Sequence, residues 1–243
     1  MIEFQQKLSQ EKPMPEERNI WLIADLHIDK SLHLATVDRL VALRQMADSE
    51  DLLIIAGDIT DDGSDEQYEL AGRMLAPWSG NIVLAPGNHD CGMCGLLWQT
   101  ACWRRWQKLC GKLGAMIETR TTDMFIVALD STLHTVWPGD LARGRIGRIQ
   151  LRKIAGWAKQ AKAEDRKLVL VAHHSPLDGE RALELVDRGE LIRKAQDCGV
   201  AMLLVGHEHK KRREIIGGLD VISAAAWKDG AAPMAIHMGT TPR

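Results

Sequence analysis

The stretch IVLAPGNHD, residues 82–90, runs from four apolar residues directly into Pro-Gly and then into Asn88, His89 and Asp90. The apolar run predicts a short buried strand, and the Pro-Gly pair predicts a tight exit from it. A chain that leaves a strand in this way presents an amide, an imidazole and a carboxylate at the strand end. The segment therefore predicts one corner of a polar site at a sheet edge, which other strand ends would have to complete.

Apolar runs of four to six residues recur along the chain and predict buried strands. They are continuous rather than alternating, as expected when both faces of a sheet are covered. Stretches with helical spacing of apolar residues separate them, which indicates an α/β architecture. The segments REIIGGLDVISAAAW and PMAIHMG near the C-terminus predict strands that close a second sheet. The predicted strands are 20–24, 52–56, 82–85, 124–129, 167–172 and 200–205, and the predicted helices are 36–49, 65–78, 96–113, 148–165 and 180–198.

Five of these strands end in side chains that bind metals or transfer protons. A single histidine after a strand is more often a surface or hydrogen-bonded residue, but recurrence at five strand ends favours a common site. In an open α/β sheet, ligands bind at the carboxyl ends of the strands. The residues, in strand order, are Asp25 and His27; Asp58 and Asp61; Asn88, His89 and Asp90; His173 and His174; and His207 and His209.

The number and type of these residues predict a metal centre with two ions. A zinc-type site needs three or four ligands, so more candidates than one site can use suit two ions about 3.5–4 Å apart. The seven candidate ligands are Asp25, His27, Asp58, Asn88, His173, His207 and His209. One carboxylate would then have to bridge the ions. Imidazole, carboxylate and amide ligands without a thiolate favour divalent or trivalent ions, manganese first, with iron and zinc as alternatives.

Five motifs occur in an order that resembles the calcineurin-like metallophosphoesterases. The resemblance covers about residues 20–225, and two softer segments, LDST (129–132) and GRIGRIQLRKIAGWA (144–158), resemble the cyclic-nucleotide-phosphodiesterase-like branch. It implies a four-layer α/β/β/α sandwich of two mixed sheets. The motifs are DLH (25–27), GDITD (57–61), GNHD (87–90), HH (173–174) and GHEH (206–209).

The resemblance also implies which residues hold which ion. Each ion would have three ligands of its own, and one carboxylate, that of Asp58, would bridge them. The implied ligands are Asp25, His27 and His209 for the first ion, and Asn88, His173 and His207 for the second.

The remaining polar residues have implied catalytic or supporting roles. His89 would act as the acid or transition-state donor, with Asp61 as its hydrogen-bond partner. His173 is the expected ligand of the HH pair because it follows the strand directly. His174 and Asp90 would then support the ligands or contact substrate.

The expected activity is metal-dependent hydrolysis of phosphodiesters or small phosphomonoesters by a hydroxide that bridges two metal ions. The expected partner is a small-molecule or nucleotide phosphoester. A nuclease of the same superfamily is an alternative, but the net charge of −2 and the lack of an added DNA-binding module disfavour nucleic acid. A non-catalytic metal-binding scaffold is a further alternative, disfavoured because every ligand and His89 are present.

Composition and segment boundaries predict one domain in the cytoplasm. Residues 1–18 are polar and are expected to form a tail or lead-in, whereas 19–243 form a single calcineurin-like phosphoesterase domain. No apolar segment resembles a secretory signal or reaches the roughly 20 residues of a membrane helix. Residues 91–122 are a candidate rim or cap insertion. Their cysteines read either as a C-x-x-C metal or redox element or, preferably, as packing residues of a helix.

Overall fold

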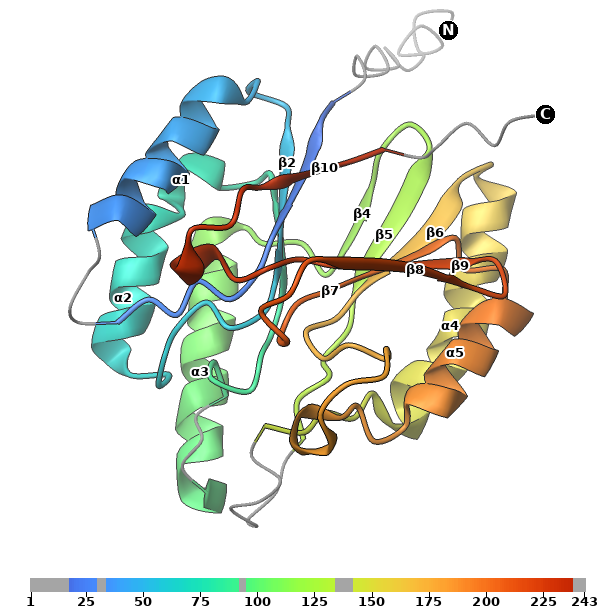
Figure 1. Cartoon of the computed structure of the whole chain (residues 1–243). Helices are drawn as coiled ribbons and strands as arrows, with labels where there is room; N and C mark the ends of the chain where they lie inside the picture. The colour runs from blue at the N-terminus through green and yellow to red at the C-terminus, as the bar shows by residue number, and fades with distance from the viewer. Residues whose placement is uncertain (1–17, 30–33, 92–94, 134–141, 238–243) are drawn as a thin grey trace, which may run out of the picture.

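The computed structural model describes residues 18–29, 34–91, 95–133 and 142–237 and contains two mixed sheets (Figure 1). In the first sheet, β1, β2 and β3 are parallel, and β10 pairs antiparallel with β1. In the second, β5, β6, β7 and β9 are parallel, with antiparallel β4 and β8 at the edges. The first sheet has the order β10 (Met234–Ile236), β1 (Ile20–Ile23), β2 (Leu52–Ala56), β3 (Ile82–Ala85). The second has the order β4 (Glu118–Arg120), β5 (Met124–Ala128), β6 (Lys167–Val171), β7 (Met202–Val205), β9 (Leu219–Ser223), β8 (Arg212–Ile216).

Helices cover the outer face of each sheet and complete the predicted four-layer α/β/β/α sandwich (Figure 1). A third apolar cluster fills the space between the two sheets. The fold class predicted from the sequence is therefore confirmed. Helices α1 (Leu34–Met46), α2 (Asp65–Met74) and α3 (Gly95–Leu113) cover the first sheet, and α4 (Gly147–Ala163) and α5 (Arg188–Asp197) cover the second.

Burial on both faces explains why the strand sequences are continuously apolar. In β2, Leu52 and Ile54 point into the layer between the sheets, whereas Leu53 and Ile55 point toward the helices. Successive side chains of a strand alternate between its faces, so each residue of a covered strand needs an apolar side chain. Because β1, β2 and β3 are parallel, and β5, β6, β7 and β9 are parallel, the carboxyl ends of the strands in each sheet lie at the same edge.

Three elements differ from the sequence prediction. Strand β4 was not predicted, and β10 joins the first sheet through β1 rather than the second. Helix α5 begins at Arg188 rather than at residue 180. The reason is that the residues before α5 pair with the backbone of Gly144. The Gly144 carbonyl accepts from Val186 N, and the Gly144 N–H donates to Glu184 O. The Asp187 carboxylate also accepts from Ile146 N and Gly147 N at 3.0 and 2.7 Å. These bonds hold residues 184–187 outside the helix.

Helix α3 packs its aromatic and sulfur side chains inward. Trp106 is buried against α2 and the first sheet, and Trp103 stacks on it with ring centroids 6.5 Å apart. Cys91 and Cys102 are buried free thiols. Within the described residues, no group of candidate metal ligands includes a cysteine. Trp98 and Cys94 lie outside the part of the chain whose side chains are described, and the rim role of 91–122 stays a prediction.

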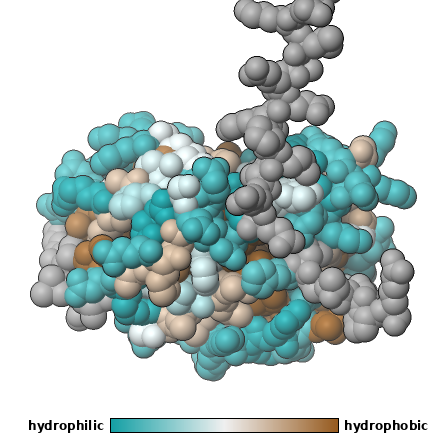
Figure 2. Space-filling model, turned by 90° about the horizontal axis from the view of Figure 1, so that it is seen from above, coloured by the Kyte–Doolittle hydropathy of each residue, from teal (hydrophilic) through white to brown (hydrophobic). Residues whose placement is uncertain are grey.

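The outer surface carries few large apolar side chains. The face shown in Figure 2 is mostly hydrophilic, with apolar side chains in small separate groups. None of the described helices combines the length and the apolarity that crossing a bilayer requires.

We expect Ile54→Ala to lower the free energy of unfolding by about 2–5 kcal/mol, because it opens a cavity between the two sheets. Ile54 is fully buried, whereas Ile149 on α4 is 66% exposed. Ile149→Ala is the matched control and should change stability by less than about 0.5 kcal/mol. Urea unfolding of both variants measures the difference, and equal destabilisation would contradict a tightly packed layer between the sheets.

Candidate metal centre

The predicted ligands converge where strands of both sheets end. Loops after β1, β2 and β3 supply residues from the first sheet, and loops after β6 and β7 supply residues from the second. Within each of four overlapping groups, one potential ligand atom per residue lies within 4.8 Å of the others. The groups are Asp25, His27 and His209; His27, Asp58 and His89; Asp25, Asp58 and His173; and His173, His174 and His207.

Asp58 lies between imidazoles that belong to different groups. Its Oδ2 is 3.6 Å from His27 Nε2 and 3.1 Å from His173 Nε2. His173 Nε2 is also 3.0 Å from His207 Nδ1. Two atoms that bind a common ion at about 2.1 Å and at right angles lie about 3 Å apart. These separations therefore match ligand atoms arranged around an ion, with Asp58 shared between two of the groups.

Buried polar atoms without partners point to the same conclusion. His27 Nε2 and Asn88 Oδ1 are buried and have no hydrogen-bond partner among the described residues. His173 Nδ1 donates to the carbonyl of Ala56 at 2.8 Å, so Nε2 faces the Asp58 carboxylate. Burial opposes a charge on His173, but Asp58 outweighs it and raises the pKa of His173 to about 9, so Nε2 holds a proton when no metal ion is bound. A bound cation would take the place of that proton between the two buried groups. The donor set fits bound metal ions.

The pKa values in the site reflect burial of its charged groups. Burial raises the pKa of Asp25 to about 7. Burial lowers the pKa of His27 to about 4 and that of His207 to about 3. Burial also opposes ionisation of Asp58, but the neighbouring His173 outweighs it and holds the pKa of Asp58 below its ordinary value. His27 and His207 are therefore neutral near pH 7, which is the form that binds metals.

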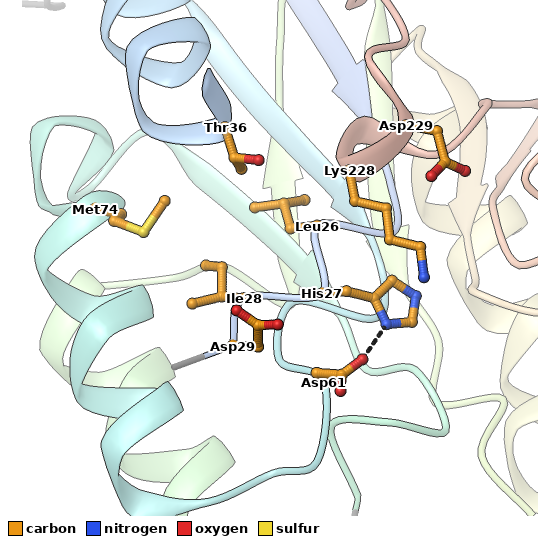
Figure 3. Close-up of a pocket in the computed structure, with 9 residues that line it drawn as sticks. All are labelled: Leu26, His27, Ile28, Asp29, Thr36, Asp61, Met74, Lys228 and Asp229. Carbon is orange, nitrogen blue, oxygen red and sulfur yellow. Dashed lines mark hydrogen bonds and ion pairs between the residues drawn. The ribbon is translucent and has the colours of Figure 1, made fainter. Parts of the chain in front are cut away.

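Two carboxylates orient the imidazoles of the first group. His27 Nδ1 lies 3.0 Å from Asp61 Oδ1, and this contact is drawn in Figure 3. His209 Nδ1 lies 3.4 Å from Asp229 Oδ2. Each contact turns the other ring nitrogen, Nε2, toward the cluster, as carboxylates commonly do for metal-binding histidines. Asp229, in the short helix η4 (Trp227–Asp229), was not predicted, because nothing in its local sequence marks it.

His89 stands beside the cluster and is held through the backbone of Asp61. His89 Nδ1 is 2.6 Å from the Asp61 carbonyl oxygen but 3.9 Å from its carboxylate. A carbonyl only accepts, so Nδ1 carries the hydrogen and Nε2 is left for other contacts. The His89 backbone N–H donates to Asp58 Oδ1 at 3.0 Å. Asp61 thus uses its backbone for His89 and its carboxylate for His27.

The hydrogen bonds of Ser131 distinguish the two adjacent histidines. Ser131 Oγ accepts from the backbone N–H groups of His173 and His174, at 3.2 and 3.1 Å. Both of its lone pairs are then used, so its hydroxyl hydrogen is donated to His174 Nδ1, 2.8 Å away. The neutral His174 ring therefore carries its own hydrogen on Nε2, whereas His173 directs its Nε2 at Asp58 and His207. This geometry favours His173 as the ligand.

Asp90 binds backbone from behind the cluster. Its carboxylate accepts from the N–H groups of Ile59, Thr60 and Gly87 at 3.2, 2.9 and 3.0 Å. These bonds tie the GNHD loop to the GDITD loop. Asp90 and His174 are both fully buried, which favours support of the ligands among the two roles predicted for them.

The backbone is strained at the proposed ligands. Asp25, His27, Asp58, His207 and His209 all have positive φ, between 44° and 74°. Among the described non-glycine residues, only one other residue, outside the site, has positive φ. A side chain in this conformation costs about 1–2 kcal/mol per residue. Hydrogen bonds between the loops stabilise the strained segments, including Asp25 N to Gly57 O and His27 N to Asp58 O at 3.0 Å each.

Glycines allow the loops to approach one another this closely. A Cβ atom at Gly57, where φ is +88°, would lie 2.4 Å from His173 Nδ1. A Cβ atom at Gly87 would lie 2.0 Å from Asp58 Oδ1. Both contacts are far shorter than van der Waals distance, so no other residue fits these positions without moving a ligand.

A profile of the calcineurin-like phosphoesterases matches residues 18–211, most of the chain. The chain belongs to the calcineurin-like phosphoesterase family. This membership confirms the predicted enzyme class, a metal-dependent hydrolase of phosphoric esters. The family implies a dinuclear metal centre, and this calcineurin-like phosphoesterase has candidate ligand residues for one.

Similar curated proteins bear the names of phosphodiesterases. The chain is 25% identical over 205 residues to a probable glycerophosphodiester phosphodiesterase GpdQ of Arcobacter nitrofigilis, covering 80% of this chain and 70% of that one. It is 25% identical over 201 residues to a glycerophosphodiester phosphodiesterase GpdQ of Enterobacter lignolyticus, covering 73% of this chain and 63% of that one. A probable cyclic nucleotide phosphodiesterase of Vesicomyosocius okutanii is 33% identical over 73 residues, covering 28% of this chain and 31% of that one.

Solved structures share the fold at low identity. A dimetal phosphatase from Danio rerio superposes with a TM-score of 0.67 at 13% identity, covering 86% of this chain and 88% of that one. The phosphopantetheinyl hydrolase PptH of Mycobacterium tuberculosis gives 0.58 at 13% identity, covering 93% and 98%. At this identity the likeness establishes the four-layer fold of this calcineurin-like phosphoesterase and nothing finer.

We expect Gly87→Ala to abolish tight metal binding and to lower stability, because its Cβ would displace the Asp58 carboxylate. Gly156→Ala is the control: its Cβ meets nothing within 4 Å, and alanine in this helix should be neutral or stabilise by up to about 1 kcal/mol. Metal content by plasma mass spectrometry and unfolding midpoints distinguish the variants. Normal metal content in Gly87→Ala would contradict the close packing of these loops.

Proposed function

We propose that this calcineurin-like phosphoesterase hydrolyses phosphodiesters or small phosphomonoesters with the help of two metal ions. The observation that carries the proposal is the position of Asp58, whose Oδ2 lies within 3.6 Å of imidazole nitrogens from two ligand groups. A single four-coordinate ion would leave three of the seven proposed ligands without a metal. Two ions with a shared carboxylate would use all seven.

The proposed ligands divide between the two ions as the family resemblance implies. Manganese is the first candidate, and iron and zinc are alternatives, because the ligands are imidazoles, carboxylates and one amide oxygen. When bound, the ions would neutralise the charge that develops on the phosphoryl group and lower the pKa of water from 15.7 toward about 7. The ligands would be Asp25, His27 and His209 for one ion, Asn88, His173 and His207 for the other, and Asp58 for both.

His89 is the proposed proton donor to the leaving oxygen. Its Nδ1 is committed to the Asp61 carbonyl at 2.6 Å, so proton transfer would occur at Nε2. The His89 side chain is 23% exposed, whereas that of His27 is only 5% exposed, so His89 remains accessible to a substrate. A donor at this position would give its proton to the departing alkoxide, which is otherwise a poor leaving group.

The substrate is proposed to be a small phosphoester. Relatives named for glycerophosphodiester and cyclic nucleotide hydrolysis support diesters as the first compounds to test. A nuclease remains the alternative, although the net charge of −2 gives no general attraction for a polyanion. A non-catalytic scaffold is less consistent with a complete set of candidate ligands beside a held His89.

The purified protein should bind about two metal ions per chain and hydrolyse bis(p-nitrophenyl) phosphate or p-nitrophenyl phosphate with added manganese. Asp58→Ala should lose both ions and at least about a hundredfold in kcat, because it removes the shared carboxylate. Metal analysis and both assays test this together. Two ions retained in Asp58→Ala would contradict the bridging role, and wild-type protein without metal or turnover would contradict the proposed function.

We expect His89→Ala to keep its metal content and to lose about 10²–10⁴-fold in kcat, the usual contribution of a general acid. Loss should be smaller for esters with good leaving groups such as p-nitrophenolate, since these need little protonation. A series of aryl phosphates with rising leaving-group pKa measures this trend. Loss of metal together with activity would instead make His89 a ligand.

A further inference from the structure

A pocket opens beside the first ligand group, next to His27 (Figure 3). It has a volume of about 270 Å³ and lies between η4, residues 26–29 after β1, Thr36 in α1 and Met74 at the end of α2. Leu26 and Ile28 are buried and form its apolar floor, with Thr36 and Met74 at the side. A cavity of this size next to a metal centre suits the organic part of a small substrate.

Lys228 is the cation of this pocket. Figure 3 shows its side chain extending toward the His27 ring. Three carboxylates line the same pocket, those of Asp29, Asp61 and Asp229. Asp61 contacts His27 and Asp229 contacts His209. Within the described ranges, the Lys228 ammonium makes no ion pair or hydrogen bond.

A metal ion held by the first ligand group would repel the Lys228 ammonium, and the repulsion is weakly screened at short range. A phosphoryl group bound to that ion would add negative charge beside the ammonium, beyond that of the pocket's own carboxylates. A monoester dianion has three non-bridging oxygens, whereas a diester monoanion has two. If the ions bind two oxygens, only the monoester keeps a charged one for Lys228.

We propose that Lys228 binds a non-bridging phosphoryl oxygen and so raises activity on phosphomonoester dianions relative to diester monoanions. The organic group of the substrate would rest on Leu26, Ile28 and Met74. Among the described lining residues the only aromatic ring is that of the proposed ligand His27, and the pocket has no Phe, Tyr or Trp, so it favours small aliphatic groups over stacked nucleobases. The proposal rests on the phosphoesterase function proposed above and names a residue that determines specificity.

The test compares Lys228→Gln and Lys228→Arg with the wild type at pH 8, where the second phosphate proton of a monoester is lost. Lys159→Gln, which removes an exposed charge on α4, is the matched control. The kinetic readout is kcat/KM for p-nitrophenyl phosphate and for bis(p-nitrophenyl) phosphate. The binding readout is the Kd of inorganic phosphate and of dimethyl phosphate by calorimetry, with metal content measured in each protein.

Lys228→Gln should lower kcat/KM for the monoester about tenfold or more, because a hydrogen bond between charged groups contributes about that factor to binding. The same change should lower kcat/KM for the diester less than about threefold. Phosphate binding should weaken in parallel, dimethyl phosphate binding should not, and Lys228→Arg should restore most of the loss. Equal losses on both esters, or loss of metal in Lys228→Gln, would overturn the role of Lys228. A wild type that binds two ions but hydrolyses neither ester would overturn the proposed function instead.

Discussion

The buried carboxylate of Asp58 is the constraint on which the rest of the site depends. It lies 3.1 Å from one imidazole nitrogen and 3.6 Å from another, in a place that water does not reach. A charge buried this deeply is stable only when it is paired. The imidazoles, the backbone N–H of His89 and the implied ions provide that pairing, and every loop in the site is shaped to bring them within reach.

The fold provides this arrangement by combining rigid strands with strained backbone at the proposed ligands. Strands covered on both faces hold the loop ends in fixed positions, while among the described non-glycine residues positive φ values are confined largely to the proposed ligands. Asp90 joins the loops after β2 and β3 through three backbone N–H groups, and Ser131 joins the histidines after β6. These two buried polar residues fix the geometry in which the proposed ligands meet.

The strands, the layered fold and the convergence of ligands could be predicted. Each depends on a local pattern in which an apolar run is followed by a glycine and then by a polar residue. What could not be predicted depends on contacts between distant segments. Asp229 orients His209 from a short helix, and the backbone carbonyl of Asp61, rather than its carboxylate, holds His89. Helix α5 begins late because Asp187 caps amide groups 40 residues away along the chain. No local pattern encodes such pairings.

The two sheets meet at the metal centre as well as in the apolar layer. The first ligand group takes Asp25 and His27 from the loop after β1 and His209 from the loop after β7. Asp58, from the first sheet, likewise faces His173, from the second. Each ion would therefore link the two sheets of the sandwich through ligands from both of them. The free energy of metal binding would then add to the free energy that holds the two sheets together. Removal of the metal would therefore lower the stability of the whole sandwich as well as its activity.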